Sequence, residues 1–434
     1  MPGAGEFPFS AAEPSLPGAA ELLTGGGQDR LARFLRDRGW EPQSLEPVQL
    51  LYRPERSLAV RFRAGARQAT TGARASFTLT AECRVDGPPP PPAPPTGLLD
   101  DPVAVSGPYL LWAFPYDPSL PGLPAAADPP LVCHRMSAQF VAVEPLRYRP
   151  RRRAVLRYRV GHEAPGPGAG AVSRRVAFAK VLPPGRAEAA LAAADLLRRR
   201  PARSLRLALP VRRLAQGALL VRPIAGHSLR TLLLGGGRLP APERIARLPE
   251  DLAEAAGPVI PEARGAGNTR RRVQVSSAER SAEVVSRLLP GLSTAARRLV
   301  ESIGAASGEP VAERIVHGDL YEGQVLVADH SLGLVDLDDV GPGDPVLDAA
   351  NFCAHLLALA VSAGQAARRV LGYRQLLRTA FLQRLSVDSR ALAWREAYAM
   401  LLLAPGPVRV LHPDWPRQVA GRVELAERLL HEGA

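Results

Sequence analysis

The sequence predicts an α+β protein with a sheet-containing N-terminal half and a helical C-terminal half. Runs with the two-residue alternation of strands occur before residue 222, whereas helical patterns dominate from about residue 282. The chain has 434 residues, which allows two or three domains. Its apolar content of 46% is ordinary for a globular protein and is enough for a core.

The first 165 residues contain a weak internal duplication. Residues 52–56 (Tyr-Arg-Pro-Glu-Arg) match residues 148–152 (Tyr-Arg-Pro-Arg-Arg), and residues 60–63 (Val-Arg-Phe-Arg) match residues 156–159 (Leu-Arg-Tyr-Arg). A repeat of about 100 residues is too long for a solenoid unit and suits a small duplicated subdomain. We therefore expect each copy to contain a strand, a Gly-containing connection and a second strand.

The second strands of the two copies differ at one position. The later copy carries Lys180 on this strand, and the earlier copy has residues 76–80 there. If Phe77 corresponds to Phe178, Leu79 takes the position of Lys180. The first copy would then have the sheet but not the cation, which favours a structural cap.

Lys180 is the only lysine among 55 basic residues. A drift in composition has replaced lysine by arginine at nearly every solvated position, because either cation keeps a protein surface soluble. A surviving lysine indicates a position that accepts a compact ammonium ion and not a planar guanidinium group. The alternative is that the one lysine stands there by chance.

Proline and glycine mark the ends of the other expected elements. Residues 187–200 have a helical pattern that is bounded by prolines on both sides, which predicts a helix there. An apolar run predicts a buried strand at 218–221. The proline tract 88–95 predicts polyproline II, and the polar segment 255–280 predicts a loop. Further helices are expected over 282–304, 345–363, 365–384, 388–403 and 416–432.

The basic character of the chain does not single out a nucleic-acid or membrane partner. The net charge is +13 and the pI is near 10.6. Arginine is nevertheless scattered, aromatic residues make up only 5% of the chain, and each arginine triplet (151–153, 198–200 and 270–272) is typical of a solvated face. We therefore expect no nucleic acid and no membrane among the partners.

Cysteine usage and the N-terminus indicate a cytoplasmic protein. Cys83, Cys133 and Cys353 are far apart, so neither a disulfide framework nor a metal spacing is predicted. The N-terminus has Glu6 in place of a basic region, and no apolar signal segment follows. The best apolar stretch, 352–363, is shorter than the ~20 residues of a membrane span. The sequence makes no prediction of oligomeric state.

Residues 311–350 reverse the sign of charge locally. Two short apolar strands flank a turn there, and both bring carboxylates to their ends. Clustered carboxylates repel one another unless a positive ion is held among them, and Mg²⁺ takes one or two carboxylates together with phosphate oxygens. Against one arginine, Arg314, this segment has nine acids: Glu313, Asp319, Glu322, Asp329, Asp336, Asp338, Asp339, Asp344 and Asp348.

The order of these residues resembles a known motif. His317-Gly318-Asp319 is followed by Gln324, by Asp336 at a strand end, and by Gly343-Asp344-Pro345. This pattern resembles the catalytic loop and metal motif of the aminoglycoside phosphotransferase and choline kinase family, which has the protein-kinase-like fold. The resemblance covers roughly residues 150–360, and the duplicated N-terminal region resembles the cap of maltokinase-like members.

The resemblance implies roles for three residues of the catalytic segment. Asp319 would be the catalytic base that orients the attacking hydroxyl. Asp336 would bind Mg²⁺ at the nucleotide phosphates. Gln324 would be the second metal ligand, although the family has Asn there and glutamine is one methylene longer. For each of them the alternative is an ordinary turn or capping residue.

The resemblance also implies nucleotide contacts in the N-terminal half. Lys180 would hold the phosphates, and Glu188 would pair with it, unless Glu188 is an ordinary solvated acid in a first helical turn. The segment with Val221 and Ile224 resembles the hinge that contacts adenine. The connection 161–170 is Gly-rich but contains prolines, which lack backbone donors, so we expect a hairpin tip there.

Other residues of the motif are expected to support it. His317 would orient the loop, Asp344 would cap the helix that Pro345 begins, and Asp348 would pack near the loop. Asp338 and Asp339 are candidates for contact with metal or a basic partner.

These inferences predict a two-lobed, kinase-like α+β fold with a mainly antiparallel small-lobe sheet. Residues 1–105 would form a cap related to the small lobe, residues 106–222 the nucleotide-binding small lobe, and residues 223–434 the helical catalytic lobe. The lysine would face the acids across a cleft that holds ATP and Mg²⁺.

The expected activity is transfer of the γ-phosphoryl group of ATP to a hydroxyl of a sugar, aminoglycoside or similar metabolite. The last 70 residues carry more arginine than acid, which favours a neutral polyol over a polycation. Trp394, Glu396, Tyr398 and the turn 411–415 are candidates for acceptor contact, but core packing is the favoured interpretation of the aromatic residues. The alternatives are a nucleotide-binding pseudokinase, motivated by Gln324, and an arginine-rich anion-binding protein.

Overall fold

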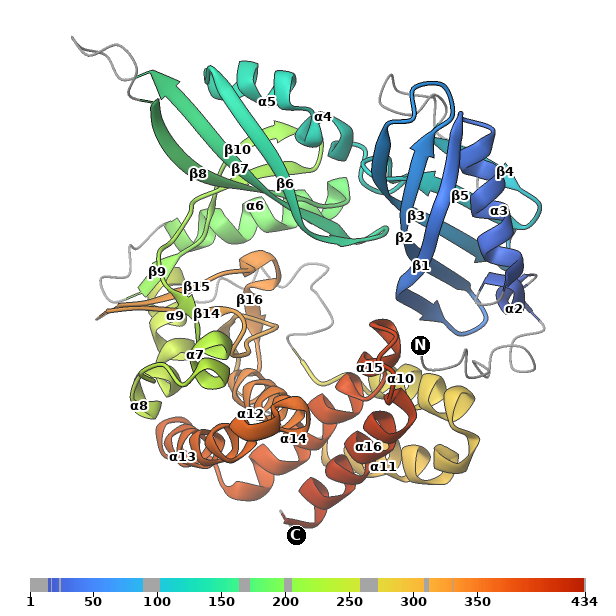
Figure 1. Ribbon diagram of the computed structural model, residues 1–434. Helices are drawn as coiled ribbons and strands as arrows, with labels where there is room; N and C mark the ends of the chain where they lie inside the picture. The colour runs from blue at the N-terminus through green and yellow to red at the C-terminus, as the bar shows by residue number, and fades with distance from the viewer. Residues whose placement is uncertain are drawn as a thin grey trace. The chain divides into compact units, whose positions relative to one another are not determined.

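The computed structural model describes residues 15–16, 18–22, 25–88, 102–163, 172–198, 205–257, 272–307, 312–329 and 331–432 (Figure 1). Contacts divide the chain into two compact units. The first unit comprises Met1–Pro184, Arg213–Leu219 and Gly406–Trp415. The second unit comprises Gly185–Arg212, Leu220–Pro405 and Pro416–Ala434.

The first unit begins with two helices and a sheet, which we call the cap sheet. Helices α2 (Ala19–Leu22) and α3 (Gly25–Arg36) come before its first strand. Leu31 and Leu35 lie one turn apart on α3 and are fully buried, as expected for the apolar face of an amphipathic helix. The strands are β1 (Trp40–Arg53), β2 (Ser57–Gln68), β3 (Arg74–Arg84), β4 (Val103–Ser106) and β5 (Tyr109–Ala113).

The cap sheet has the strand order β1-β2-β3-β5-β4, and its paired strands are antiparallel. The sheet extends to Ala113, beyond the limit of residue 105 expected for the cap. Of the predicted polyproline tract 88–95, only Pro88 lies among the described residues.

A second sheet, which we call the Lys180 sheet, follows in the first unit. Two helices come before it, and Asp128 caps α5 by accepting a hydrogen bond from Leu131 N over 3.1 Å. Its strand order is β10-β11-β8-β7-β6, and β7 is antiparallel to both β6 and β8. The elements are α4 (Leu123–Ala127), α5 (Pro129–Met136), β6 (Phe140–Arg149), β7 (Arg153–Glu163), β8 (Val172–Val181), α6 (Pro184–Arg198, in the second unit from Gly185 on), β10 (Pro210–Ala215) and β11 (Ala218–Val221).

The strand register corrects one expectation about the duplication. Val155, the third residue of β7, pairs with Lys180, and Ala59, the third residue of β2, pairs with Glu82. Glu82 therefore takes the position of Lys180, and the assignment of Leu79 to that position is wrong. Matching two phenylalanines shifted the strand by three residues, and an odd shift places a side chain on the opposite face of the sheet.

The second unit is mainly helical and contains two small sheets. One has the strand order β12-β14-β15-β9, and the other pairs β13 with β16. The strands are β9 (Leu205–Leu207), β12 (His227–Ser228), β13 (Arg314–Val316), β14 (Val325–Ala328), β15 (Ser331–Leu334) and β16 (Gly341–Gly343). The helices up to the catalytic segment are α7 (Leu229–Gly235), α8 (Pro242–Ala246), α9 (Leu248–Ala256), α10 (Val275–Leu288) and α11 (Ser293–Ala306). Those after it are α12 (Pro345–Ser362), α13 (Ala367–Leu385), α14 (Ser389–Leu403), α15 (Gly406–Arg409, in the first unit) and α16 (Trp415–Glu432).

Four of the five C-terminal helices agree with the prediction within two residues, and α6 begins three residues before the expected start. The predicted helix 282–304 is wrong, because Pro290 and a short 3₁₀ turn (Pro290–Leu292) separate α10 from α11. Helix α10 starts at Val275, so the predicted loop 255–280 is too long. Its middle part, 258–271, and most of the predicted hairpin tip, 164–170, lie outside the described residues.

Helix α12 forms the centre of the helical core. It packs against α13 and α14, and Phe352 lies 6.2 Å from Phe381 between ring centroids. By length and composition α12 could cross a membrane, with a mean hydropathy of 1.4, but 72% of it is buried inside the protein. Burial of this kind is typical of a core helix, so its apolar sequence is explained by packing.

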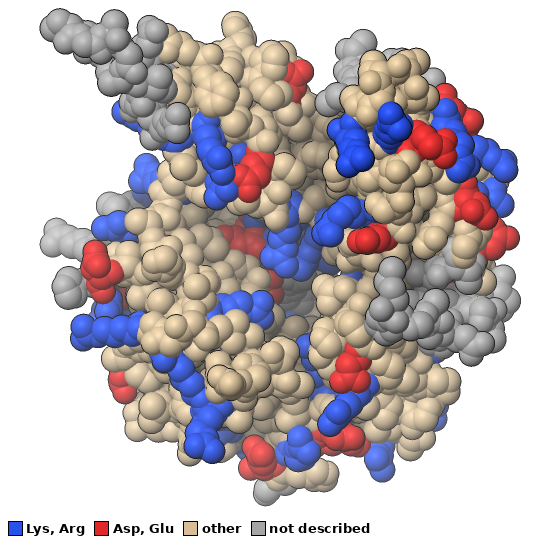
Figure 2. Space-filling model, in the orientation of Figure 1, with Lys and Arg blue, Asp and Glu red and all other residues tan. Residues whose placement is uncertain are grey.

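Arginine side chains are distributed over the surface among acidic ones. Figure 2 shows both signs of charge on the same face. Many arginines form ion pairs, such as Arg384 with Glu250 at 2.7 Å and Arg298 with Glu427 at 3.1 Å. Among the described residues the three cysteines are free thiols, and Cys83 and Cys353 are buried.

Candidate active site

The predicted catalytic loop, residues 317–324, lies between β13 and β14 in the second unit. Gly318 has a φ of +80°, which glycine adopts without strain. The buried carboxylate of Asp348, in the first turn of α12, accepts hydrogen bonds from His317 N at 2.7 Å and Gly318 N at 3.0 Å. The prediction that Asp348 supports the loop is confirmed.

Asp348 has an unusual protonation equilibrium. Burial raises its pKa to about 6, although His317 and the two backbone N–H groups act in the opposite direction. Water is excluded from this carboxylate, so its charge depends on the loop backbone for stabilisation. The position of the loop and the protonation of Asp348 are therefore coupled.

The backbone on both sides of Asp319 is held by side chains from other elements. Asn351 Nδ2 on α12 donates to Leu320 O over 2.9 Å, and the Tyr321 ring stacks on His355 at 4.3 Å. Asp319 itself is half-buried. An acid fixed in this way, and still partly accessible, can orient a bound hydroxyl group.

An ion pair between buried Glu322 and the exposed side chain of Arg230 holds the following part of the loop. Glu322 is fully buried, and its Oε1 accepts from Arg230 Nε at 2.9 Å. Neither this pair nor Asn351 was predicted to belong to the site. Asn351 could have been found, because it lies three residues after Asp348 on the same helical face. Arg230 is too distant in sequence to give a local signal.

Gln324 and Asp336 are joined directly. Gln324 Nε2 donates to Asp336 Oδ2 over 2.9 Å, and Val335 N donates to Gln324 O over 3.0 Å. His317 Nε2 lies 3.0 Å from Val335 O, which agrees with its expected orienting role. Asp336 adopts a left-handed conformation with φ of +64°, which is uncommon for residues other than glycine, although aspartate adopts it more often than most. The end of the catalytic loop and the end of β15 therefore form one polar cluster.

This cluster suits Mg²⁺ bound together with phosphate. Asp336 offers a carboxylate and Gln324 an amide oxygen, and Mg²⁺ takes few protein oxygens when a substrate supplies phosphate oxygens. The described residues contain no group of three or more His, Cys, Asp or Glu side chains that could hold a metal alone. The donor set fits an ion that arrives with a nucleotide.

Two further acids of the segment, Asp339 and Asp344, have side-chain or backbone partners. Asp339 Oδ1 accepts from Arg186 Nη2 at 2.6 Å, so it contacts a basic side chain. Asp344 Oδ1 caps α12 by accepting from Val346 N at 2.8 Å, as predicted. Its Oδ2 accepts from buried Arg395 Nε at 2.6 Å.

The expected nucleotide contacts are distributed over both units. Lys180 lies in the first unit on β8 and is buried, with 9% of its surface exposed. Glu188 is exposed on α6 in the second unit. Val221 ends β11 and is half-buried. Ile224 packs against β15, because a Cβ added to Gly333 would lie 2.6 Å from Ile224 Cδ1.

The candidate acceptor residues on α14 belong to the core. Trp394 and Tyr398 are buried, and fully buried Glu396 accepts from Arg374 at 2.6 Å and from Arg378 at 3.0 Å. The favoured interpretation of these side chains as packing residues is confirmed.

Several solved structures resemble the chain at low identity. A choline/ethanolamine kinase family protein from Mesorhizobium loti is 16% identical, with 71% of this chain and 92% of that chain covered and a TM-score of 0.45. A spectinomycin phosphotransferase in complex with ADP and spectinomycin is 11% identical, with 70% and 98% covered and a TM-score of 0.47. An aminoglycoside phosphotransferase from Streptomyces rimosus is 18% identical, with 63% and 96% covered and a TM-score of 0.40.

No curated protein sequence matches the chain. The model of the phosphotransferase enzyme family, however, matches residues 148–382, which is more than half of the chain. The resemblance inferred from the catalytic motif is thereby confirmed, and with it the kinase-like α+β fold. The chain belongs to the phosphotransferase enzyme family.

Proposed function

We propose that the protein is an ATP-dependent kinase that transfers the γ-phosphoryl group to a hydroxyl of a small molecule. The observation that carries this proposal is the catalytic loop, in which Asp319 is partly accessible while the backbone around it is fixed by Asp348, Asn351 and Glu322. Phosphoryl transfer depends on positioning and charge stabilisation more than on covalent chemistry. An acid held on the same loop as Gln324, which is bonded to Asp336, can provide both.

Each residue has a separate task in this proposal. Asp319 accepts the proton of the acceptor hydroxyl and orients its oxygen. Asp336, with Gln324, holds Mg²⁺, which supplies charge neutralisation at the nucleotide phosphates when bound. Lys180 contributes an ammonium charge to the same phosphates. Val221 and Ile224 belong to the segment that contacts adenine.

The acceptor is proposed to be a sugar or another neutral polyol. Its support is the excess of arginine over acid in the last 70 residues, which disfavours a polycationic drug. Aminoglycosides and amino alcohols remain within the class that the family acts on. We propose a cytoplasmic location, in keeping with the three free thiols.

The test is a screen for ATP consumption over sugars, aminoglycosides and amino alcohols. It is run with the wild-type protein and with Lys180→Met, a substitution that keeps the aliphatic stem. We expect a hydroxyl-bearing acceptor to stimulate turnover, and the variant to lose at least ~100-fold in rate, as for a lost electrostatic group. An active enzyme that is indifferent to this substitution would refute the role of Lys180.

A pseudokinase is the second candidate, and one contact favours it. The Gln324 amide donates to Asp336 Oδ2, so one oxygen of this carboxylate already accepts a hydrogen bond and is less available to a metal ion. Mg²⁺-dependent ATP binding without a phosphorylated product across the whole panel would support this candidate over a kinase.

A further inference from the structure

The cap sheet and the Lys180 sheet have the same arrangement of strands. In each, a helix precedes three consecutive strands that are neighbours, β1-β2-β3 and β6-β7-β8. In each, the third strand has a later strand, β5 or β11, on its other side, and the strand just before that one lies at the edge. Five strands with one order and one sequence of connections are a specific likeness.

The turns between the first two strands also correspond. Three residues separate β1 from β2, and three separate β6 from β7. The middle residue is in the left-handed region in both turns, with φ of +56° at Glu55 and +59° at Arg151. Residues other than glycine rarely adopt this conformation, so its recurrence at matched positions extends the sequence repeat to the backbone.

Counting from these turns places Glu82 and Lys180 at the same site of the two sheets. Both side chains are buried, with 3% of Glu82 and 9% of Lys180 exposed. The cap sheet thus has an acid where the Lys180 sheet has the candidate phosphate-binding cation. A carboxylate at this position repels phosphate, so the cap sheet has lost the property proposed for Lys180.

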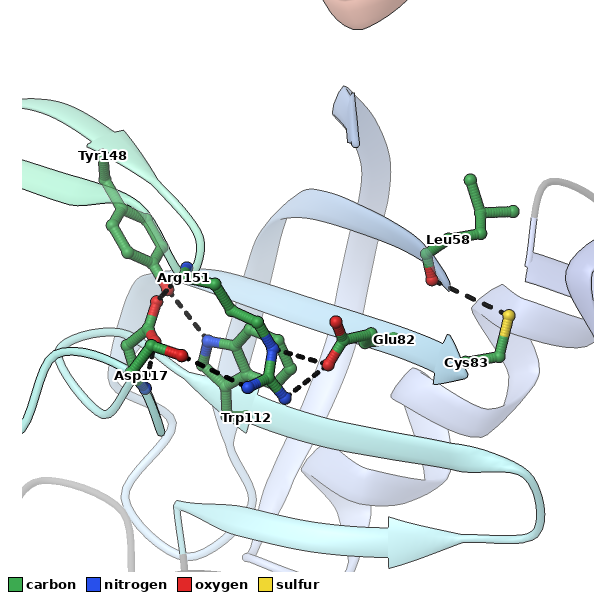
Figure 3. Close-up of polar contacts among 8 residues, drawn as sticks. Leu58, Glu82, Cys83, Trp112, Asp117, Tyr148 and Arg151 are labelled. Atoms are coloured by element: carbon green, nitrogen blue, oxygen red, sulfur yellow. Dashed lines mark hydrogen bonds and ion pairs between the residues drawn. The ribbon is translucent and has the colours of Figure 1, made fainter. Parts of the chain in front are cut away.

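Glu82 has a different partner, which comes from the other sheet (Figure 3). Arg151 Nε donates to Glu82 Oε2 over 2.6 Å, and Arg151 Nη2 also contacts this oxygen. Arg151 Nη1 donates to Ser119 Oγ over 3.2 Å, and the guanidinium carbon lies 5.4 Å from the Trp112 ring centroid. Arg151 is the residue at the tip of the β6–β7 turn, so Glu82 of the cap sheet holds this turn in place.

A second acid, Asp117, also holds the β6–β7 turn. Asp117 Oδ2 accepts from Arg151 N at 2.7 Å and from the Tyr148 hydroxyl at 2.9 Å. The same hydroxyl accepts from Trp112 Nε1 at 2.8 Å, and Arg61 Nη1 donates to Tyr148 O over 2.6 Å. Burial raises the pKa of Asp117, while its hydrogen bonds to Arg151, Ser119 and Tyr148 lower it. The turn is therefore fixed at Tyr148 and at Arg151 by charged and polar groups of the cap sheet and of Asp117.

The contacts of Arg151 act on β7, the strand that pairs with the Lys180 strand β8. Strand β7 leaves the turn at Arg153, and Val155 on it pairs with Lys180 across the ladder. Paired residues of adjacent antiparallel strands have Cβ atoms only about 5 Å apart, so a displaced turn moves the backbone that presents Lys180.

We propose that the cap sheet is a diverged copy of the Lys180 sheet that binds no nucleotide, and that its Glu82, together with Asp117, positions Lys180 through Arg151. Glu82 and Arg151 are positioning residues in this view. The inference rests on the proposed function of Lys180 as a nucleotide ligand. It adds that nucleotide affinity depends on an ion pair within the N-terminal region, between residues that touch no nucleotide.

The experiment is a titration of the full chain with Mg²⁺ and a fluorescent ATP analogue. The test variant is the double substitution Glu82→Gln with Arg151→Met, which removes both charges of the ion pair, while Asp117 keeps its hydrogen bonds from Arg151 N, Ser119 N and the Tyr148 hydroxyl. We expect its dissociation constant to rise about tenfold, a usual size for coupling between separate sites. In turnover, KM for ATP should rise while KM for the acceptor stays unchanged, a difference that loss of fold does not produce.

The matched control is Glu144→Gln with Arg157→Met, which removes an ion pair between β6 and β7 in the same sheet. It should leave the affinity for the analogue unchanged. Arg151→Lys keeps the buried charge but lacks the planar guanidinium group, so the variant should fold and show an intermediate affinity for the analogue. One analogue should bind per chain.

The outcomes separate the two proposals. Binding by the wild-type protein that is lost in Lys180→Met, but unchanged in both Arg151 variants, overturns the inference and leaves the function standing. Two analogues bound per chain also overturn it. No binding to the wild-type protein overturns both proposals.

Discussion

Gln324 donates a hydrogen bond to the carboxylate of Asp336, and this contact joins the end of the catalytic loop to the end of β15. Asp336 sits in a left-handed conformation there, so its position depends on the groups around it. The side chain that departs from the family motif is thus the one that holds the candidate metal ligand.

Replacement of Gln324 by leucine should weaken Mg²⁺ binding. The substitution keeps an apolar stem of similar size but removes the amide that orients Asp336, and loss of such an orienting group costs about 10–100-fold in metal affinity. The measurement is the Mg²⁺ concentration at half-maximal ATP binding. Gln375→Leu, at an exposed position of α13, serves as the control. An unchanged Mg²⁺ midpoint in Gln324→Leu would exclude this role.

Asp348→Asn should flatten the dependence of stability on pH. The pKa of Asp348 is raised from its ordinary value of 3.8 to about 6 in the folded protein. A raised folded-state pKa means that the folded protein binds the proton more tightly. The contribution to stability is then fully present below about pH 4 and is lost as the pH rises through about 6.

The expected size of this effect is about 3 kcal/mol, because each unit of pKa is worth about 1.4 kcal/mol. Urea unfolding of both proteins between pH 4 and pH 7 measures it. The wild-type protein should lose stability relative to the variant over this range. Parallel profiles would contradict the coupling between Asp348 and the loop backbone. Asp388→Asn, at the exposed cap of α14, controls for loss of a capping carboxylate.

Breaking the buried pair of Arg395 and Asp344 should destabilise the second unit. Arg395→Met leaves Asp344 buried without its charged partner, which costs about 3–5 kcal/mol. Arg298→Met breaks an ion pair in which the Arg298 side chain is 66% exposed, and it should cost less than about 1 kcal/mol. Chemical denaturation of the two variants gives the comparison. Equal losses would show that burial does not set the value of this pair.

The local parts of the site could be predicted from the sequence, and the long-range parts could not. Asp344 stands before Pro345 and an apolar helix, so its capping role follows from neighbours in the chain. The contact of Glu322 with Arg230 depends on how distant segments pack, and no local pattern reports it. The position of Glu82 opposite Ala59 depends on strand register. Aligning Phe77 with Phe178 gave a register that is wrong by three residues.

The fold class was predictable because alternating and helical patterns occupy separate parts of the chain. The helix expected over 282–304 failed because helical propensity on both sides concealed the break at Pro290. The expected pairing of Glu188 with Lys180, and the cap layout shared with maltokinase-like proteins, stay predictions.

The role of Asp319 as the base is the central claim, and transfer of labelled γ-phosphate from ATP to an acceptor tests it most directly. Asp319→Asn keeps the shape of the side chain but cannot accept the proton, so transfer should fall at least ~100-fold while ATP binding is retained. Asp329→Asn, in the exposed turn between β14 and β15, should transfer phosphate at the wild-type rate. Wild-type transfer by Asp319→Asn would contradict the account.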